Sequence, residues 1–249
     1  MSAPHLLLLA GTAEARALAE ELAGWPLRLT VSLAGVTRRP APLPGRPRIG
    51  GFGGAAGLAA WIAAHDVTLV VDATHPYAAR ISANAALAAR ESGCPLLRLE
   101  RAEWVPDEYD IWINFNSLTD ALHALPQASR PLLTTGSGTR VAFGLRPDLR
   151  ITLRAIEPVP DLPPNWVEIR ARPPFSEAEE RALMEARSIT HLITRNSGGA
   201  GRARCDAARG LGLPVFMLRR PAPPAGVETV ADLPAALERI AARLGGVSE

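Results

Sequence analysis

The chain has 249 residues, a length typical of two domains, and its 47% hydrophobic and 21% charged residues are typical of a globular protein. A formal net charge of +2 excludes a strongly basic nucleic-acid-binding surface, so we expect no nucleic-acid partner. All 27 basic residues are arginines, which excludes Schiff-base catalysis on lysine and a Walker-type phosphate loop.

The two cysteines, Cys94 and Cys205, have no metal-ligand spacing. We therefore expect no metal site and no disulfide, a pattern typical of a cytoplasmic protein. The leucine-rich run 6–10 is too short to span a bilayer, so it predicts a buried first strand rather than a membrane contact.

A polar turn follows this first strand and precedes a helix expected over 15–23. A glycine at such a position lets the backbone approach a ligand, and the helix N-terminus favours an anion there. Only one of the three glycines of the dinucleotide fingerprint is present, so a plain tight turn explains the pattern equally well. The cofactor-binding candidates in this turn are Gly11, Thr12 and Glu14.

The second strand, expected over 27–31, lacks the acidic residue that usually binds the ribose of NAD. Ser32 and Gly35 follow it, and then Arg38 and Arg39, a pattern that suits the 2′-phosphate of NADP. We predict that these four residues bind NADPH. The alternative is a solvated Arg-Pro loop.

Glycine occupies four of the five positions 50–54. Because glycine loses much backbone entropy on folding, such a cluster indicates either close approach of a flat or charged ligand or a flexible turn. We name Gly50, Gly51 and Gly53 as cofactor-binding candidates, with a helix over 56–64 after them.

The densest polar chemistry follows the apolar run 67–71, which predicts a buried parallel strand, and precedes a helix over 78–93. The ends of such strands are where ligands bind in open α/β sheets. We predict that Asp72, His75 and Tyr77 are catalytic, orienting a substrate ring or donating a proton, and that Thr74 contacts the cofactor. The alternative is that Asp72 or Thr74 caps the helix and His75 is a surface residue.

The remaining chain continues the alternation of strands and helices. Strands are expected over 95–99 and 109–115 and a helix over 118–125, followed by a linker at 126–130. A second alternating unit then has strands over 131–134, 151–156, 166–169, 191–194 and 215–218 and helices over 176–185 and 202–210. Ser176 and Glu179 form a predicted capping box at the start of the first of these helices.

Regular alternation of this kind predicts an α/β fold with parallel sheets. We expect two Rossmann-like domains, 1–127 and 128–249, with a ligand cleft between them. An amphipathic tail helix is expected over 232–244, and it can pack back on the first domain. Polar turns also end two strands of the second unit, and the turn 195–199 suits an anion, either a substrate carboxylate or a cofactor pyrophosphate.

Taken together, six motifs resemble the precorrin-6A reductase family, known as CobK or CbiJ. They are the turn 11–14, the block Asp-Ala-Thr-His-Pro-Tyr-Ala at 72–78, the cluster 98–104, and the turns 134–136, 194–199 and 219–221. They run in order over nearly the whole chain, and the block at 72–78 is the most specific of them.

The resemblance implies an oxidoreductase acting on a CH–CH group, which reduces precorrin-6A to precorrin-6B in cobalamin biosynthesis with NADPH as cofactor. It implies a tetrapyrrole substrate, with transient contact to neighbouring cobalamin-pathway enzymes. That substrate carries many carboxylates, which arginines and backbone amides should hold. The substrate-binding candidates are Arg80, Thr135, Gly136, Ser137, Arg195, Asn196, Ser197, Gly198 and Gly199.

Two positions depart from the family pattern, which usually has lysine where this chain has Arg195 and often again at Cys205. Arg195 keeps the charge with a different donor geometry, whereas Cys205 loses it. Two other function classes also fit the glycine turn and the arginine pair. They are a nucleotide-sugar or sugar-phosphate binding protein of similar α/β architecture without redox chemistry, and a dinucleotide sensor. The block 72–78 favours the enzyme, because a sensor needs no acid, imidazole and phenol.

Overall fold

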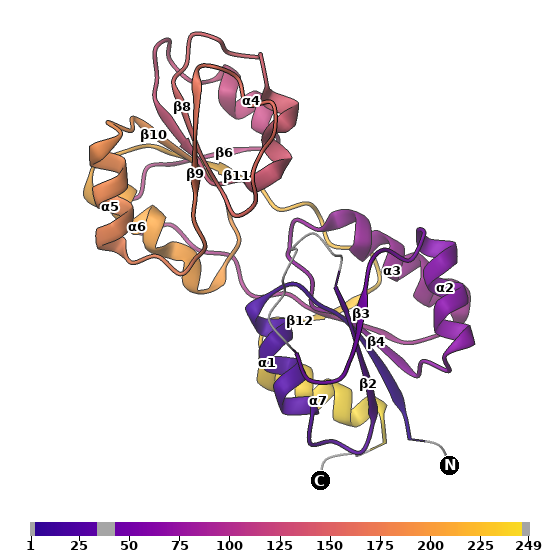
Figure 1. Cartoon of the computed structure of the whole chain (residues 1–249). Helices are drawn as coiled ribbons and strands as arrows, with labels where there is room; N and C mark the ends of the chain where they lie inside the picture. The colour runs from indigo at the N-terminus through magenta and orange to yellow at the C-terminus, as the bar shows by residue number, and fades with distance from the viewer. Residues whose placement is uncertain (1–2, 34–42, 246–249) are drawn as a thin grey trace. The chain divides into compact units, whose positions relative to one another are not determined.

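The protein is described by a computed structural model that covers residues 3–33 and 43–245, without the side chains of residues 137 and 138. The chain forms two compact units, which Figure 1 colours along the sequence. Unit 1 comprises Met1–Ala102 and Pro221–Glu249, and unit 2 comprises Glu103–Arg220.

Unit 1 is built on a six-stranded parallel sheet with the order β12-β5-β4-β1-β2-β3. The chain extends the sheet in one direction from β1 to β2 and β3, and in the other to β4 and β5. Ligands bind at such a reversal of strand order in α/β proteins. The strands are β1 (His5–Leu9), β2 (Arg28–Leu33), β3 (Arg46–Ile49), β4 (Leu69–Asp72), β5 (Leu96–Leu99) and β12 (Glu228–Val230).

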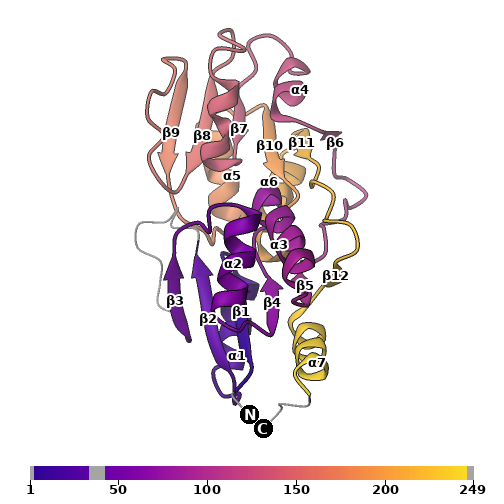
Figure 2. The same ribbon diagram turned by 90° about the vertical axis from the view of Figure 1, so that its right-hand side faces the viewer.

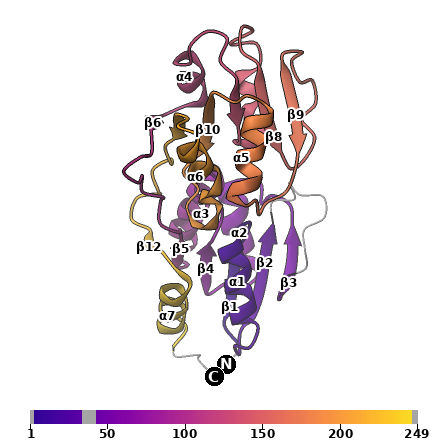
Figure 3. The same cartoon turned by 90° about the vertical axis from the view of Figure 1, so that its left-hand side faces the viewer.

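Helices cover both faces of this sheet. Helices α2 (Ala55–Ala64) and α3 (Ala79–Ser92) lie side by side on one face (Figure 2), and α1 (Ala13–Leu22) and α7 (Leu233–Arg243) cover the other (Figure 3). Side chains of β1 alternate accordingly, because successive residues of a strand point to opposite faces. Leu6 and Leu8 pack in the core shared with α1 and α7, whereas Leu7 and Leu9 pack against α2 and α3.

Unit 2 repeats the plan with a second six-stranded parallel sheet, in the order β6-β11-β10-β7-β8-β9. Leu132, Leu192 and Met217 of its central strands pack in one core cluster with residues of the helices α5 and α6. Figure 3 shows these two helices in front of the strands of unit 2. The strands are β6 (Trp112–Phe115), β7 (Pro131–Leu133), β8 (Ile151–Ala155), β9 (Trp166–Arg170), β10 (His191–Arg195) and β11 (Val215–Leu218). The helices are α4 (Leu118–His123), α5 (Glu177–Ala186), α6 (Ala203–Gly210) and the short 3₁₀ helices η1 (Gly136–Ala142) and η2 (Gly199–Arg202).

The division into units differs from the expected boundary after residue 127. β6 was expected to close the first domain, but it pairs with β11 and therefore belongs to unit 2. The segment 126–130 is accordingly a loop inside unit 2, where Arg150 N–H donates to the carbonyl of Ser129. The chain returns to unit 1 after Arg220, where β12 pairs with β5 and α7 packs in the core that contains α1.

The structure also shows where the expected helix cap and strand ends lie. The capping box of α5 is confirmed, with Ser176 N–H donating to Glu179 Oε2 at 2.7 Å and Glu179 N–H donating to Ser176 Oγ at 3.2 Å. Asp72 lies inside β4 rather than after it, and β3 and β12 are strands that were not expected. No helix in the described part of the chain is long and apolar enough to cross a membrane.

Candidate functional site

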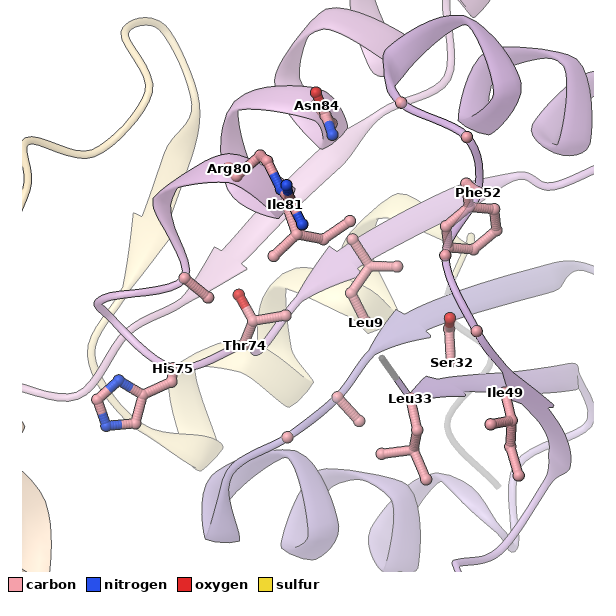
Figure 4. A pocket seen from close by; sticks show the side chains of 17 residues that line it. Leu9, Ser32, Leu33, Ile49, Phe52, Thr74, His75, Arg80, Ile81 and Asn84 are labelled. Atoms are coloured by element: carbon pink, nitrogen blue, oxygen red, sulfur yellow. The ribbon is translucent and has the colours of Figure 1, made fainter. Parts of the chain in front are cut away.

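A pocket of about 820 Å³ lies at the carboxyl edge of the unit 1 sheet (Figure 4). Residues at the ends of β1, β2, β3 and β4 line it, together with the first two turns of α3. Leu33, Ile49 and Phe52 supply apolar surface, and Ser32 and Thr74 supply hydroxyl groups. A largely apolar pocket with a few placed polar groups is typical of a small-molecule or cofactor site.

Five glycines of the two turns that face this pocket give the backbone close access to it. Gly11 and the glycines of the turn 50–54 line the pocket, and a Cβ added at any of them would project into open space. Gly53 and Gly54 have φ of 81° and 97°, values that residues with a side chain rarely adopt. Side chains at these positions would fill the cavity, so the glycines fit a ligand that lies against the backbone.

Asp72 is held in a buried ion pair beneath the pocket and does not line it. Arg98 Nη1 donates to Asp72 Oδ2 at 2.5 Å and to Ser82 Oγ at 2.6 Å, and Arg98 Nε donates to Glu100 Oε2 at 2.5 Å. The other oxygen of Asp72 accepts from the N–H and the hydroxyl of Thr74, at 3.1 Å and 2.6 Å. Both oxygens of Asp72 therefore have partners, and the carboxylate fixes Thr74 at the pocket wall.

The alternative in which Asp72 or Thr74 caps the following helix is wrong. The residue at the N-cap of α3 is Ala78, which offers no side-chain hydrogen bond. The polar residues of this block hold the strand end and the turn rather than the helix.

His75 lies at the rim of the pocket, where Figure 4 shows its ring turned away from Ser32 and Ile49. Its Nδ1 lies 3.2 Å from the N–H of Tyr77, so this nitrogen is an acceptor and a neutral ring carries its proton on Nε2. The rings of His75 and Tyr77 are 5.7 Å apart. The half-buried imidazole therefore has its Nδ1 held by the turn.

Two of the predicted cofactor residues have contacts within the fold of unit 1. The hydroxyl of Thr12 accepts from the N–H of Ala15 at 3.1 Å, which caps α1, and donates to the carbonyl of Ala73 at 2.9 Å. Glu14 accepts from Arg101 at 2.5 Å. Neither residue lines the pocket, whereas Gly11, their neighbour in the same turn, does.

Three of the predicted cofactor residues, Gly35, Arg38 and Arg39, lie outside the described residues. Ser32 and Thr74, expected to bind the cofactor with them, line the pocket. Arg80, expected to bind the substrate, lines the same pocket from α3, and so does Asn84 one turn further on (Figure 4). The structure therefore brings Arg80 together with the expected cofactor residues that line this pocket, which are Gly11, Ser32, Gly50, Gly51, Gly53 and Thr74.

In unit 2, the turn after β7 carries an unusual hydroxyl group. Thr135 is 3% exposed, and its Oγ1 has no hydrogen-bond partner among the residues that the structure describes. A buried polar atom without a partner is unfavourable unless a ligand or water satisfies it. Gly136 follows with φ of 70°, and the side chain of Ser137 lies outside the described residues.

The turn after β10 is anchored by Asn196. Its side chain accepts from the N–H of Trp104 at 2.8 Å and donates to the carbonyl of Trp104 at 2.9 Å. Trp104 Nε1 donates in turn to the carbonyl of Gly199 at 2.7 Å. Gly198 and Gly199 both have positive φ, 67° and 66°. Asn196 was expected to contact substrate, but its amide group is used to hold this turn, which Arg195 and Ser197 share.

Cys205 stands where the family often has a lysine, and the structure shows what it does instead. The residue is fully buried in the core cluster of unit 2, and burial raises the pKa of its thiol to about 12. It is therefore a neutral core residue and offers no anion contact. Within the described residues, no group of three or more His, Cys, Asp or Glu side chains could hold a metal ion.

Sequence reasoning missed the apolar wall of the pocket and the residue behind the glycine turn. Leu33, Ile49 and Phe52 line the pocket, and Arg48 contacts the turn from the other side. Ile49 is 66% exposed, an unusual state for isoleucine that only the structure reveals. Leu33 and Ile49 are the last residues of β2 and β3, and Phe52 follows β3. This position at the strand ends is the one sequence signal that could have found them, once β3 is recognised as a strand.

Comparison with known proteins gives a consistent result over the whole chain. The family described as precorrin-6x reductase CbiJ/CobK matches residues 5–241. The precorrin-6A reductase of Rhodococcus erythropolis is 47% identical over 238 residues, which cover 94% of this chain and 96% of that protein. The precorrin-6A reductase of Sinorhizobium sp is 44% identical over 246 residues, covering 97% and 94%.

One solved structure, of CobK precorrin-6A reductase, matches with a TM-score of 0.90 at 39% sequence identity. The match covers 98% of this chain and 100% of that chain. The predicted α/β fold with two parallel sheets is therefore confirmed by the strand order and by this structural match.

Proposed function

Because this chain belongs to the precorrin-6x reductase family CbiJ/CobK, we propose that it catalyses the NADPH-dependent reduction of precorrin-6A in cobalamin biosynthesis. The family membership makes the chain a reductase, and a reductase of this kind implies a nicotinamide cofactor. That cofactor supplies a hydride when it is bound. The remaining steps depend on residues of this chain.

The observation that carries the cofactor proposal is the pocket at the carboxyl edge of the unit 1 sheet. It lies where strand order reverses at β1, it has room for a drug-sized ligand, and glycines at 11, 50, 51, 53 and 54 leave its backbone accessible. We assign the dinucleotide to this pocket, with Ser32 and Thr74 as hydrogen-bonding groups. Thr12 and Glu14 support the turn without reaching the ligand.

The choice of NADPH over NADH is based on charge. Strand β2 ends in Ser32 and Leu33, without the acid that binds an unmodified ribose, and Arg38 and Arg39 follow in the sequence. Arg80 adds a third cation at the pocket wall. We propose that the arginine pair binds the 2′-phosphate and that Arg80 faces the phosphates of the same ligand.

The proton chemistry falls to His75 and Tyr77 rather than Asp72. A neutral His75 carries its proton on Nε2, because Nδ1 accepts from the N–H of Tyr77, and we propose that this imidazole takes part in proton transfer at the rim of the pocket. Asp72 is occupied by Arg98 and Thr74, so we propose that it positions Thr74 and the turn. His75 and Tyr77 orient the substrate ring or donate the proton that accompanies reduction.

Unit 2 supplies the proposed substrate contacts. The precorrin rim carries carboxylates, for which the backbone N–H groups of the turn 195–199 and the charge of Arg195 are suited. The unpartnered hydroxyl of Thr135 supports a ligand contact at Gly136 and Ser137 as well. Asn196 keeps the turn in shape through Trp104. Contact with neighbouring enzymes of the pathway stays a prediction.

The proposal is tested by titrating the protein separately with NADPH and NADH while following tryptophan fluorescence and thermal shift. We expect NADPH to bind more tightly than NADH. The double variant Arg38→Ala/Arg39→Ala should reduce the difference between the two affinities. An unchanged preference in that variant would move the 2′-phosphate site elsewhere. Absence of any response to either nucleotide would remove the cofactor proposal.

A further inference from the structure

The glycine-rich turn 50–54 forms one wall of the unit 1 pocket, and other residues must hold it in one conformation. Glycine at 50, 51, 53 and 54 gives this segment many accessible backbone conformations. A binding wall made of such a segment loses affinity if the segment must be ordered when the ligand arrives. The structure shows which side chain orders it beforehand.

Arg48, the third residue of β3, holds the turn by donating to backbone carbonyl groups of the turn. Its Nη1 donates to the carbonyl of Gly50 at 2.5 Å, and its Nη2 donates to the carbonyl of Gly51 at 2.9 Å. The guanidinium also lies 3.6 Å from the ring centroid of Phe52. Three successive residues of the turn are therefore fixed by one planar cation, a geometry that lysine cannot reproduce.

A second contact fixes the far side of the turn. A Cβ added at Gly57 would meet the carbonyl oxygen of Phe52 at 1.9 Å, so the turn lies directly on the first turn of α2. Phe52 also packs edge-on against Trp61 of α2, with ring centroids 5.7 Å apart. The turn is thus held between Arg48 and α2.

We infer that Arg48 is a positioning residue for the cofactor: it holds the turn 50–54 in the shape that binds the dinucleotide. Arg48 does not line the pocket, whereas all five residues of the turn do. Its contribution to binding is therefore indirect and depends on the turn. Burial lowers the pKa of Arg48 from its ordinary value. The inference rests on the proposed function, since it concerns the same pocket.

The test compares Arg48→Gln and Arg48→Lys with Arg46→Gln as a matched control. Arg46 lies two residues earlier on the same strand, is exposed, and is not part of the pocket. Dissociation constants for NADPH and NADH are measured by tryptophan quenching, and KM and kcat by turnover. Loss of two charge-assisted hydrogen bonds should weaken both nucleotides by about tenfold to hundredfold in Arg48→Gln, with a smaller loss in Arg48→Lys.

The expected signature is a raised KM for both nucleotides with kcat within about twofold of the wild type, and no change in Arg46→Gln. If Arg48→Gln does not fold, Arg48→Lys and Gly57→Ala, which displaces the turn from α2, carry the same test. Unchanged binding, or a fall in kcat at constant KM, would contradict the inference.

The comparison of the two nucleotides separates positioning from direct contact. Loss of NADPH affinity alone would show that Arg48 touches the 2′-phosphate, which overturns the positioning role while leaving the proposed function intact. Wild-type protein that binds neither nucleotide would overturn both. The wild-type titration therefore reveals failure of the proposed function, and the Arg48 variants reveal failure of the positioning role.

Discussion

Arg98 and Asp72 form an ion pair, 2.5 Å between Nη1 and Oδ2, whose two side chains are only 3% and 2% exposed. It lies at the ends of the neighbouring strands β4 and β5, where Asp72 and Arg98 are register partners. The pair joins the most specific motif of the sequence to the next strand. It also explains how an acid can sit beside a ligand pocket without being available to it.

Removing one partner of this pair should destabilise the protein strongly. Arg98→Leu leaves the buried carboxylate of Asp72 without its cation, so we expect the free energy of unfolding to fall by about 3–5 kcal/mol in urea denaturation. Arg181→Leu is the control, because its pair with Glu185 is 46% and 55% exposed and should contribute about 1 kcal/mol or less. A fully stable Asp72→Asn protein without turnover would instead return Asp72 to a catalytic role.

His75→Ala should lower kcat while the melting temperature stays within a few degrees of the wild type. The ring is half-buried at the rim of the pocket and accepts a hydrogen bond from Tyr77 N–H. Steady-state kinetics and thermal unfolding of the same preparation measure both quantities. Loss of folding with unchanged activity per folded molecule would make His75 structural.

Stability should decrease when the pH falls below about 6.5, because His5 is buried as a neutral ring. Its Nδ1 lies 2.8 Å from the carbonyl of His65 and its Nε2 lies 2.8 Å from Thr30 Oγ1. Burial, with smaller contributions from Arg28 and His65, lowers its pKa from 6.5. As the pH falls, the unfolded chain therefore binds the proton before the folded protein does. The contribution of neutral His5 to the free energy of unfolding is present above pH 6.5 and is lost as the pH falls below it.

The measurement is urea denaturation across this pH range in the wild type and in His5→Gln, which keeps an amide donor and acceptor. The variant should show a flatter pH profile, although His191, whose pKa is also lowered by burial, still contributes. His123→Gln at an exposed position should leave the profile unchanged. Equal profiles in the wild type and His5→Gln would contradict this account.

Arg195→Ala should weaken binding of the anionic ligand that lies at the turn 195–199. A charge-assisted contact contributes about 1.5–3 kcal/mol, which corresponds to roughly tenfold to hundredfold in affinity. We expect the effect on the tetrapyrrole substrate, with NADPH binding unchanged, and partial mimicry by added salt. Arg187→Ala, at an exposed position of unit 2, is the control. If neither dissociation constant changed, the turn would have no ligand.

Sequence patterns predicted the strand ends well, because apolar runs and turn residues are local signals. Gly11, Ser32 and Thr74 were expected from such ends and Gly50 from its glycine cluster, and all four line one pocket. The partners of individual side chains were not predictable. Asn196 is held by Trp104, 92 residues away, and nothing in its own turn indicates that pairing.

The expected domain boundary after residue 127 differs more from the structure, and the reason is again non-local pairing. β6 and β12 are short edge strands, and each pairs with a strand far from it in sequence. Alternation along the chain predicts parallel sheets, but it does not say which sheet an edge strand joins. Arg48 was overlooked for a similar reason, since its role depends on where its guanidinium points.

The proposed activity of this chain is the reduction of precorrin-6A with NADPH. Its most direct test is anaerobic incubation of the purified protein with precorrin-6A and NADPH, following nicotinamide oxidation and product mass together. We predict that one NADPH is consumed for each product formed, that the product gains two hydrogens, and that NADH supports a slower reaction. Absence of NADPH oxidation, with the tetrapyrrole recovered at its original mass, would contradict the claim.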